Sequence, residues 1–137
     1  MVFIKHFELA KKFNLPMFFH SRSSEKDFYD ILKANIEGIP GGILHCFTGS
    51  VEEMKNLLEL GIYIGLAGLS FKTEENLKMV KQIPLEKIVL GTDCPFCIVK
   101  DDYAGAKYIK THFEITPKSM YKTDNLVKGR TEPCSLV

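Results

Sequence analysis

The sequence has 137 residues, of which 45% are hydrophobic, so its apolar content is sufficient for the core of one domain. Its 18 basic and 17 acidic side chains leave a formal net charge of +1, which argues neither for nor against a nucleic-acid partner. No apolar stretch reaches the roughly 18 residues that a membrane-spanning helix requires, which excludes such a helix.

The segment 2–13 combines charged residues with apolar residues at helical spacing, namely Phe3, Phe7, Ala10 and nearby Phe13. Its charges are typical of an amphipathic helix and not of the apolar part of a secretory leader. Because no leader is predicted, the four cysteines indicate a reducing compartment, the cytoplasm or the nucleus.

Short apolar runs and helical patterns alternate after this first helix. Amphipathic spacing predicts three further helices, which begin after Ser23 or Ser24, after a Ser50–Glu53 capping box, and after Thr73. The expected strands are 17–19, 43–44, 62–66 and 88–90.

Strands that are apolar on both faces and joined by helices run parallel with both faces covered, so the pattern predicts an α/β sheet. Two arrangements satisfy it: a doubly wound sheet, which places its ligand where the strand order reverses, and a segment of a (β/α)8 barrel. Polar residues at almost every strand end favour the barrel, since these ends converge on one mouth. A complete barrel needs about 250 residues, so we expect a partial TIM barrel.

Three of the predicted strands are followed by a side chain that can bind a metal ion: His20, His45 and Asp93. Imidazole and carboxylate groups are the ligands that a hydrolytic divalent cation needs. Any one of the three could be an ordinary structural residue, but their shared position at strand ends favours a common metal site. His6 and His112 lie outside the strand ends and are expected at the surface.

Arg22 lies two residues after His20 and is a candidate for binding a phosphate through its planar guanidinium group. A surface ion pair with Glu25 or Asp27 explains its position equally well. Both interpretations stay open.

Cys94 and Cys97 have the C-x-x-C spacing of redox and zinc-binding motifs. The pair follows a strand-end aspartate instead of opening a helix, and the sequence has no second C-x-x-C. We therefore expect neither thioredoxin-like chemistry nor a zinc knuckle.

Apolar periodicity fades after residue 97, so we expect one domain with βα units over 1–97 and a long loop region over 98–137. Aromatic residues among lysines in this region can stack on nucleic-acid bases, or they can pack the loop against the barrel rim. The sequence leaves both open for Tyr103, Tyr108, Phe113 and Tyr121.

Four strand-end motifs occur in a fixed order: His20-Ser21-Arg22, His45-Cys46-Phe47-Thr48-Gly49, Tyr63-Ile64-Gly65 and Thr92-Asp93-Cys94-Pro95. In this order and spacing they resemble the C-terminal half of the TatD family of metal-dependent deoxyribonucleases. Segments 104–111 and 130–134 resemble the eukaryotic TatD-domain branch of that family. The resemblance covers nearly the whole chain.

The resemblance implies an amidohydrolase-type (β/α)8 barrel that hydrolyses DNA phosphodiester bonds with two divalent cations, which are Mg, Mn or Zn. The four predicted strands would be the last four of that barrel. His20 and His45 match ligands of one cation, while Asp93 matches a ligand of the other and the acceptor of a proton from the attacking water. Arg130 and Glu132 match an Arg-x-Glu-Pro signature near the substrate cleft.

The sequence also departs from the family pattern. It has no counterpart of the family's first-strand His-x-His or fourth-strand bridging glutamate, and Gly91 and Thr131 replace a usual glutamate and asparagine. We expect a metal-dependent deoxyribonuclease that needs a missing N-terminal half or self-association to complete its site. The alternatives are an inactive remnant that acts as a binding or oligomerising module, and an amidohydrolase with another substrate.

Overall fold

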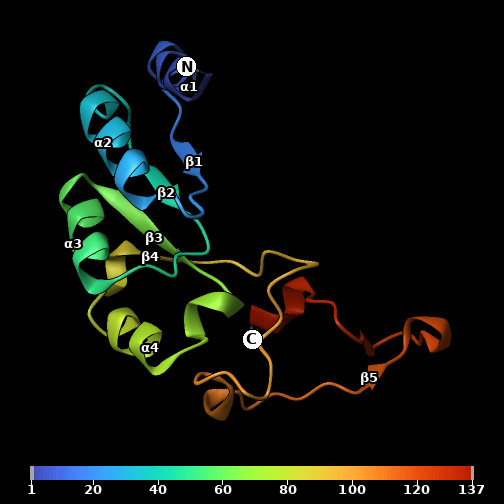
Figure 1. The fold of residues 1–137 in the computed structure, drawn as a ribbon. Helices are drawn as coiled ribbons and strands as arrows, with labels where there is room; N and C mark the ends of the chain where they lie inside the picture. The colour runs from blue at the N-terminus through green and yellow to red at the C-terminus, as the bar shows by residue number, and fades with distance from the viewer. Residues whose placement is uncertain (1, 137) are drawn as a thin grey trace.

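The computed structural model describes residues 2–136 and contains a sheet of four parallel strands with helices beside it (Figure 1). The spatial order β1-β2-β3-β4 follows the chain, and all neighbours are parallel. A doubly wound sheet reverses its order at one point, so this sheet is a segment of a barrel, as predicted. The strands are β1 (Met17–Phe19), β2 (Gly42–Leu44), β3 (Ile62–Leu66) and β4 (Ile88–Leu90).

Among the described residues, four α-helices precede or connect the strands of the sheet, and their positions confirm the helices predicted from apolar spacing. Hydroxyl caps begin α3 and α4: the Ser50 Oγ accepts a hydrogen bond from the Glu53 N–H at 3.1 Å, and the Thr73 Oγ1 accepts one from the Asn76 N–H at 3.1 Å. The helices are α1 (Val2–Phe13), α2 (Glu25–Asn35), α3 (Val51–Glu59) and α4 (Glu74–Val80).

The cap predicted for α2 is wrong in one respect. Ser24, one of the two predicted capping residues, does precede the helix directly. Its side chain, however, makes no capping hydrogen bond. Its backbone lies outside the extended region, and its hydroxyl pairs instead with that of Ser21 at 3.0 Å. Ser23 has a left-handed backbone and does not cap the helix either.

The strand register separates side chains onto two faces of the sheet. Phe19, Leu44 and Ile64 are aligned across the strands and buried beneath the helices. Together with helix residues they form the core, so the sheet is held by helix packing on this face. The main helix contributions to the core are Phe7, Phe28, Leu32, Met54, Leu57 and Met79.

The opposite side of the sheet, here called the open face, carries Phe18, Ile43, Tyr63 and Val89. Phe18 is 71% exposed, and Tyr63 and Val89 are each 40% exposed. The prediction that both faces would be covered is therefore wrong for the part of the chain that the structure describes. In a closed barrel this face lines an interior filled by eight strands, and residues 2–136 contribute four of them.

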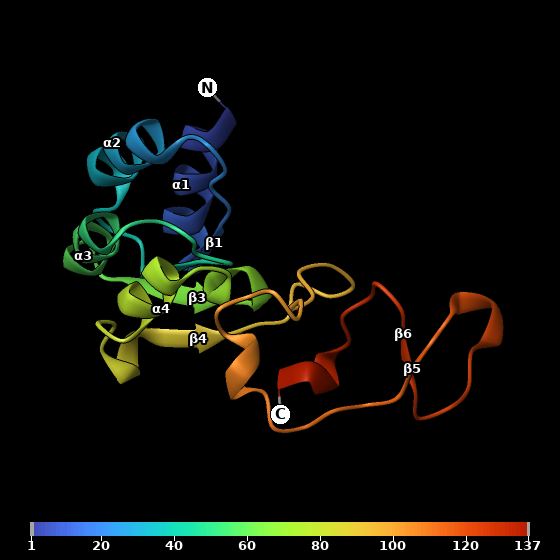
Figure 2. The ribbon, with the colours of Figure 1, turned by 60° about the horizontal axis from the view of Figure 1, so that its bottom comes forward.

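The segment after β4 leaves the sheet and has little regular structure, apart from short 3₁₀ turns and the paired strands β5 (Ile115–Thr116) and β6 (Leu126–Val127) (Figure 2). Tyr103 is buried, which agrees with the prediction that aromatic residues of this region pack the loop. The other three aromatic residues are exposed: Tyr108, Phe113 and Tyr121. No helix within residues 2–136 is long and apolar enough to cross a bilayer.

Replacing Met54 by alanine should lower the free energy of unfolding by about 2–5 kcal/mol, because this side chain is fully buried between α3 and the sheet. Its neighbour Lys55 is exposed on the same helix, and Lys55→Ala should change stability by less than about 0.5 kcal/mol. Urea unfolding followed by circular dichroism measures both. Equal losses would contradict the assignment of the core.

Candidate metal centre

The two predicted histidine ligands extend neighbouring strands. His20 follows the last residue of β1 and His45 follows the last residue of β2, and the His45 N–H donates to the Phe19 carbonyl at 3.1 Å. Strand alternation therefore continues through both residues and places them on the side of the sheet that carries Phe18. The sequence position alone thus directs both imidazoles to the same rim of the open face.

The two imidazoles are in direct contact. The His20 Nδ1 and His45 Nε2 lie 2.9 Å apart, so one ring donates its N–H and the other accepts it. Phe18 stacks on the His45 ring with a centroid separation of 5.0 Å, which orients that imidazole. Two nitrogens bound to one cation at about 2.1 Å lie about 3.0–3.4 Å apart, so this pair fits a shared divalent cation after a small opening.

Gly65 of β3 makes room for His45. A Cβ at position 65 would lie 2.8 Å from the His45 Cα and 3.1 Å from the Leu44 carbonyl oxygen, closer than side chains normally approach. The Tyr63-Ile64-Gly65 motif therefore supports the histidine backbone by close packing. Its glycine has a steric role and is not itself a ligand.

Asp93 lies in a different local arrangement. The Gly91 N–H still donates to the Leu66 carbonyl at 2.8 Å, but the backbone of Asp93 is left-handed, with φ of 54°, so strand alternation no longer sets its direction. Its Oδ2 accepts a hydrogen bond from the Cys97 thiol at 2.9 Å. Cys97 in turn contacts Cys46, with 3.8 Å between the two sulfurs.

The structure thus gathers the candidate ligands into two adjoining sets. His20 and His45 form one, while Cys46, Asp93 and Cys97 form the other, with ligand atoms that all lie within 4.8 Å of one another. Within residues 2–136, Asp93 forms no such group with the two histidines. The peptide bond between His45 and Cys46 joins the two sets.

Sequence reasoning missed Cys46 and Cys97 as members of this centre. The C-x-x-C spacing pairs Cys97 with Cys94, but Cys94 is exposed and is not a member of the cluster. The available signal was the position of Cys46 beside His45 at a strand end. The remaining requirement, a loop that returns Cys97 to that strand end, has no local sequence pattern.

The loop that carries Cys97 packs against the backbone of Gly68, just after β3. A Cβ at this position would clash with the backbone carbonyl of Cys97. The loop after β4 therefore rests directly on the backbone at Gly68, which brings Cys97 over the end of β3 and against Cys46.

Both clustered thiols are held in the protonated form. Burial raises the pKa of Cys97, and its hydrogen bond to the Asp93 carboxylate raises it further. Burial likewise raises the pKa of Cys46. At neutral pH each sulfur is therefore a thiol, and a metal ion would have to displace its proton.

Of the predicted substrate-binding residues, Arg22 follows His20 by two residues, and Arg130 and Glu132 belong to the segment after β4. Arg22 is exposed, and the alternative ion pairs with Glu25 and Asp27 are not formed within the described residues. The Arg130 Nε contacts the Glu132 Oε1 at 2.7 Å, and both residues line an open groove of about 1060 Å³.

A backbone hydrogen bond holds this groove against the loop that carries Asp93. The Thr131 N–H donates to the Pro95 carbonyl at 3.0 Å, and Pro95 follows Asp93 by two residues. The segment from Arg130 to Glu132 therefore lies beside the loop after β4, although nearly forty residues separate the two in sequence.

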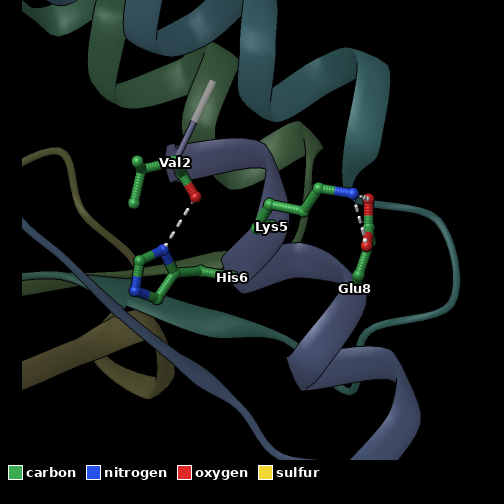
Figure 3. A network of polar contacts seen from close by, with 4 residues as sticks. All are labelled: Val2, Lys5, His6 and Glu8. Carbon is green, nitrogen blue, oxygen red and sulfur yellow. Dashed lines mark hydrogen bonds and ion pairs between the residues drawn. The ribbon is translucent and has the colours of Figure 1, made fainter.

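The two histidines predicted to lie at the surface are exposed. Figure 3 shows His6 on α1, where its Nδ1 donates to the Val2 carbonyl at 3.1 Å beside the Lys5–Glu8 ion pair. His6 thus has a local role in the first helix. It serves as a matched control for substitutions of the clustered histidines.

The family model described as "TatD related DNase" matches residues 1–124. The chain is 43% identical to "Deoxyribonuclease Tat-D" of Schizosaccharomyces pombe, over 98% of this chain and 44% of that protein. It is 35% identical to "3'-5' ssDNA/RNA exonuclease TatD" of Escherichia fergusonii, over 72% of this chain and 39% of that protein. The chain thus spans less than half the length of these relatives.

A solved structure shares the fold. The hydrolase TatD family protein from Entamoeba histolytica is 37% identical, with a TM-score of 0.86 over 94% of this chain and 43% of that one. The four strands and their helices are therefore part of a larger barrel architecture in that protein.

Alkylation should distinguish the clustered thiols from the others. Cys94 and Cys134 are exposed, whereas Cys46 and Cys97 are half-buried with raised pKa values and hold less reactive thiolate at neutral pH. Iodoacetamide should therefore modify Cys94 and Cys134 first, as measured by peptide mass spectrometry over time. In urea all four rates should converge, and equally fast labelling in the native chain would refute the cluster.

Proposed function

Because the chain belongs to the TatD-related DNase family, we propose that it contributes to a metal-dependent hydrolase of DNA phosphodiester bonds. The names of two relatives support a nucleic-acid substrate, since one is a deoxyribonuclease and the other a single-stranded DNA and RNA exonuclease. The chain covers 44% of the first relative, so the activity of the whole protein is part of the proposal.

The observation that carries the proposal is the contact between His20 and His45 at the carboxyl ends of adjacent parallel strands. In barrel enzymes this end of the strands holds the reacting groups. A divalent cation, with Mg, Mn and Zn as the candidates, would there polarise a phosphate oxygen and lower the pKa of a water molecule.

Asp93 is proposed as a ligand of a second cation and as the group that takes the proton from the attacking water. Its Oδ2 is held by the Cys97 thiol at 2.9 Å, which leaves Oδ1 to accept that proton. Arg22 is exposed beside His20 and is proposed to bind a phosphate, where its planar guanidinium group can donate two hydrogen bonds. Arg130 and Glu132 line the adjoining groove and are proposed to contact the DNA strand.

A second candidate function follows from the open face. Its exposed Phe18, Tyr63 and Val89 form an apolar row, and strands β1 and β4 each have one edge without a strand partner among residues 2–136. We propose that another barrel half covers this face, supplied either by a missing N-terminal segment or by a second copy. A chain that only associates in this way would be a binding or oligomerising module without hydrolytic activity.

Hydrolysis is tested with single- and double-stranded oligonucleotides in the presence of Mg²⁺, Mn²⁺ or Zn²⁺, analysed by gel electrophoresis. The reaction should stop on addition of a chelator. His45→Ala should lower the rate by about 10²-fold or more through loss of a cation ligand, and Asp93→Asn by a similar factor through loss of the proton acceptor.

The matched control for these variants is His6→Ala, which changes a surface histidine of α1 and should keep the original rate. Cleavage that survives both the chelator and Asp93→Asn would come from another agent. Absence of any cation-dependent cleavage would reject hydrolysis by this chain alone and favour the binding module.

Self-association is tested by light scattering coupled to size-exclusion chromatography. The chain should form a concentration-dependent oligomer, and Val89→Lys should shift it towards the monomer because a charge on the open face opposes burial. Leu85→Lys changes an apolar residue that is 84% exposed in the turn before β4, outside the sheet, and should leave the mass unchanged. A chain that remains monomeric at high concentration rules out the second copy.

A further inference from the structure

The cluster of Cys46, Asp93 and Cys97 has a ligand chemistry unlike that of the histidine pair. Two sulfurs and one carboxylate are a donor set for a thiophilic ion such as Zn²⁺, and sulfur ligands disfavour Mg²⁺. Catalytic and open zinc sites use three protein ligands and leave the fourth position free. The cluster supplies that number from residues whose side chains are all half-buried.

The spacing of the two sulfurs matches that of a zinc site. Two sulfur ligands at about 2.3 Å from a tetrahedral zinc ion lie about 3.8 Å apart. The sulfurs of Cys46 and Cys97 are 3.8 Å apart. Neither loop has to move to bring the two sulfurs into position.

The third ligand requires a small adjustment. A sulfur and an oxygen bound to the same zinc ion lie about 3.5 Å apart, whereas the Cys97 Sγ and Asp93 Oδ2 are 2.9 Å apart because a thiol proton bridges them. A metal ion would replace that proton and separate the two atoms by about half an ångström, within the range of side-chain rotation.

The backbone holds all three residues in an uncommon conformation. Cys46, Asp93 and Cys97 have φ values of 52°, 54° and 57°, a left-handed region that residues other than glycine adopt only at a cost. The contact between Gly68 and the Cys97 carbonyl fixes one of these turns from below. The surrounding structure thus holds the three donor residues together.

A disulfide is the competing use of the two cysteines. A disulfide requires about 2.05 Å between the sulfurs, so the present pair would have to approach by nearly 2 Å. The negative Asp93 carboxylate beside Cys97 also opposes formation of the thiolate that starts the exchange reaction. The geometry favours a bridging ion over a covalent bond.

We propose that Cys46, Asp93 and Cys97 form a zinc site distinct from the His20–His45 pair, with one position open to water or a ligand. Both cysteines release their protons to solvent when the ion binds, and the Asp93 Oδ2 changes its partner from the Cys97 thiol to the ion, while Oδ1 is not used by the site. The site needs reduced cysteines, and all four cysteines of the chain are free.

The test uses the reduced 137-residue chain without nucleic acid, and Co²⁺ serves as a spectroscopic substitute for Zn²⁺. One equivalent of Co²⁺ should produce the strong visible bands of a tetrahedral ion and a near-ultraviolet sulfur-to-cobalt charge-transfer band. One equivalent of Zn²⁺ should remove both. Cys97→Ser should weaken binding by at least about 100-fold, since even changes to outer-shell partners cost about 10–100-fold in metal affinity.

Cys94→Ser is the matched control, because Cys94 belongs to the same loop but is exposed and outside the cluster. This variant should keep the spectrum, and circular dichroism verifies that both serine variants are folded. His45→Ala should also retain the charge-transfer band, which separates the two sets of ligands.

Three results would overturn the proposal: a spectrum without sulfur charge transfer, equal effects of Cys94→Ser and Cys97→Ser, or formation of a Cys46–Cys97 disulfide with no uptake of metal. Because the titration contains no DNA, its failure leaves the hydrolase proposal standing. Conversely, absence of DNA cleavage leaves the zinc site standing.

Discussion

The parallel pairing of β1 to β4 in chain order is the constraint on which the candidate centre depends. It puts the carboxyl ends of all four strands at one edge, so short loops are enough to bring residues from distant parts of the sequence together. Strand alternation then directs His20 and His45 to the same side. Helix packing on the other face holds the sheet in this register, through Phe19, Leu44 and Ile64. The site is thus a consequence of how the sheet is stacked against its helices.

Much of this arrangement could be predicted because its signals are local. The Ser50–Glu53 capping box, the apolar strands and the histidines directly after them are each read within a few residues. The cysteine cluster could not be predicted in this way. It depends on the left-handed backbone of Asp93 and on the close packing of Cys97 against Gly68. Both features are set by tertiary packing. The covered sheet was predicted wrongly for the described residues because burial of an inner face depends on strands beyond these four.

Asp93 connects two different chemistries. Its carboxylate accepts a hydrogen bond from the Cys97 thiol, and it follows β4 at the end of the sheet that also carries the two imidazoles. Oxygen and nitrogen donors suit the harder cations that activate water on phosphate esters, whereas sulfur donors select softer ones. Asp93 belongs to the sulfur set, and the histidine set adjoins it through the peptide bond between His45 and Cys46.

Within residues 2–136 the outer edges of β1 and β4 have no strand partner, and this limits how two copies could meet. All four strands run in the same direction, so joining β4 of one copy to β1 of another as parallel neighbours requires a rotation axis along the strands. A twofold axis of that orientation would place the histidine pairs of both copies at a single mouth. An axis across the strands would instead pair identical edges antiparallel, β1 with β1 or β4 with β4, and send the two histidine pairs to opposite ends. Symmetry alone therefore decides whether a dimer has one reaction chamber or two separate half-sites.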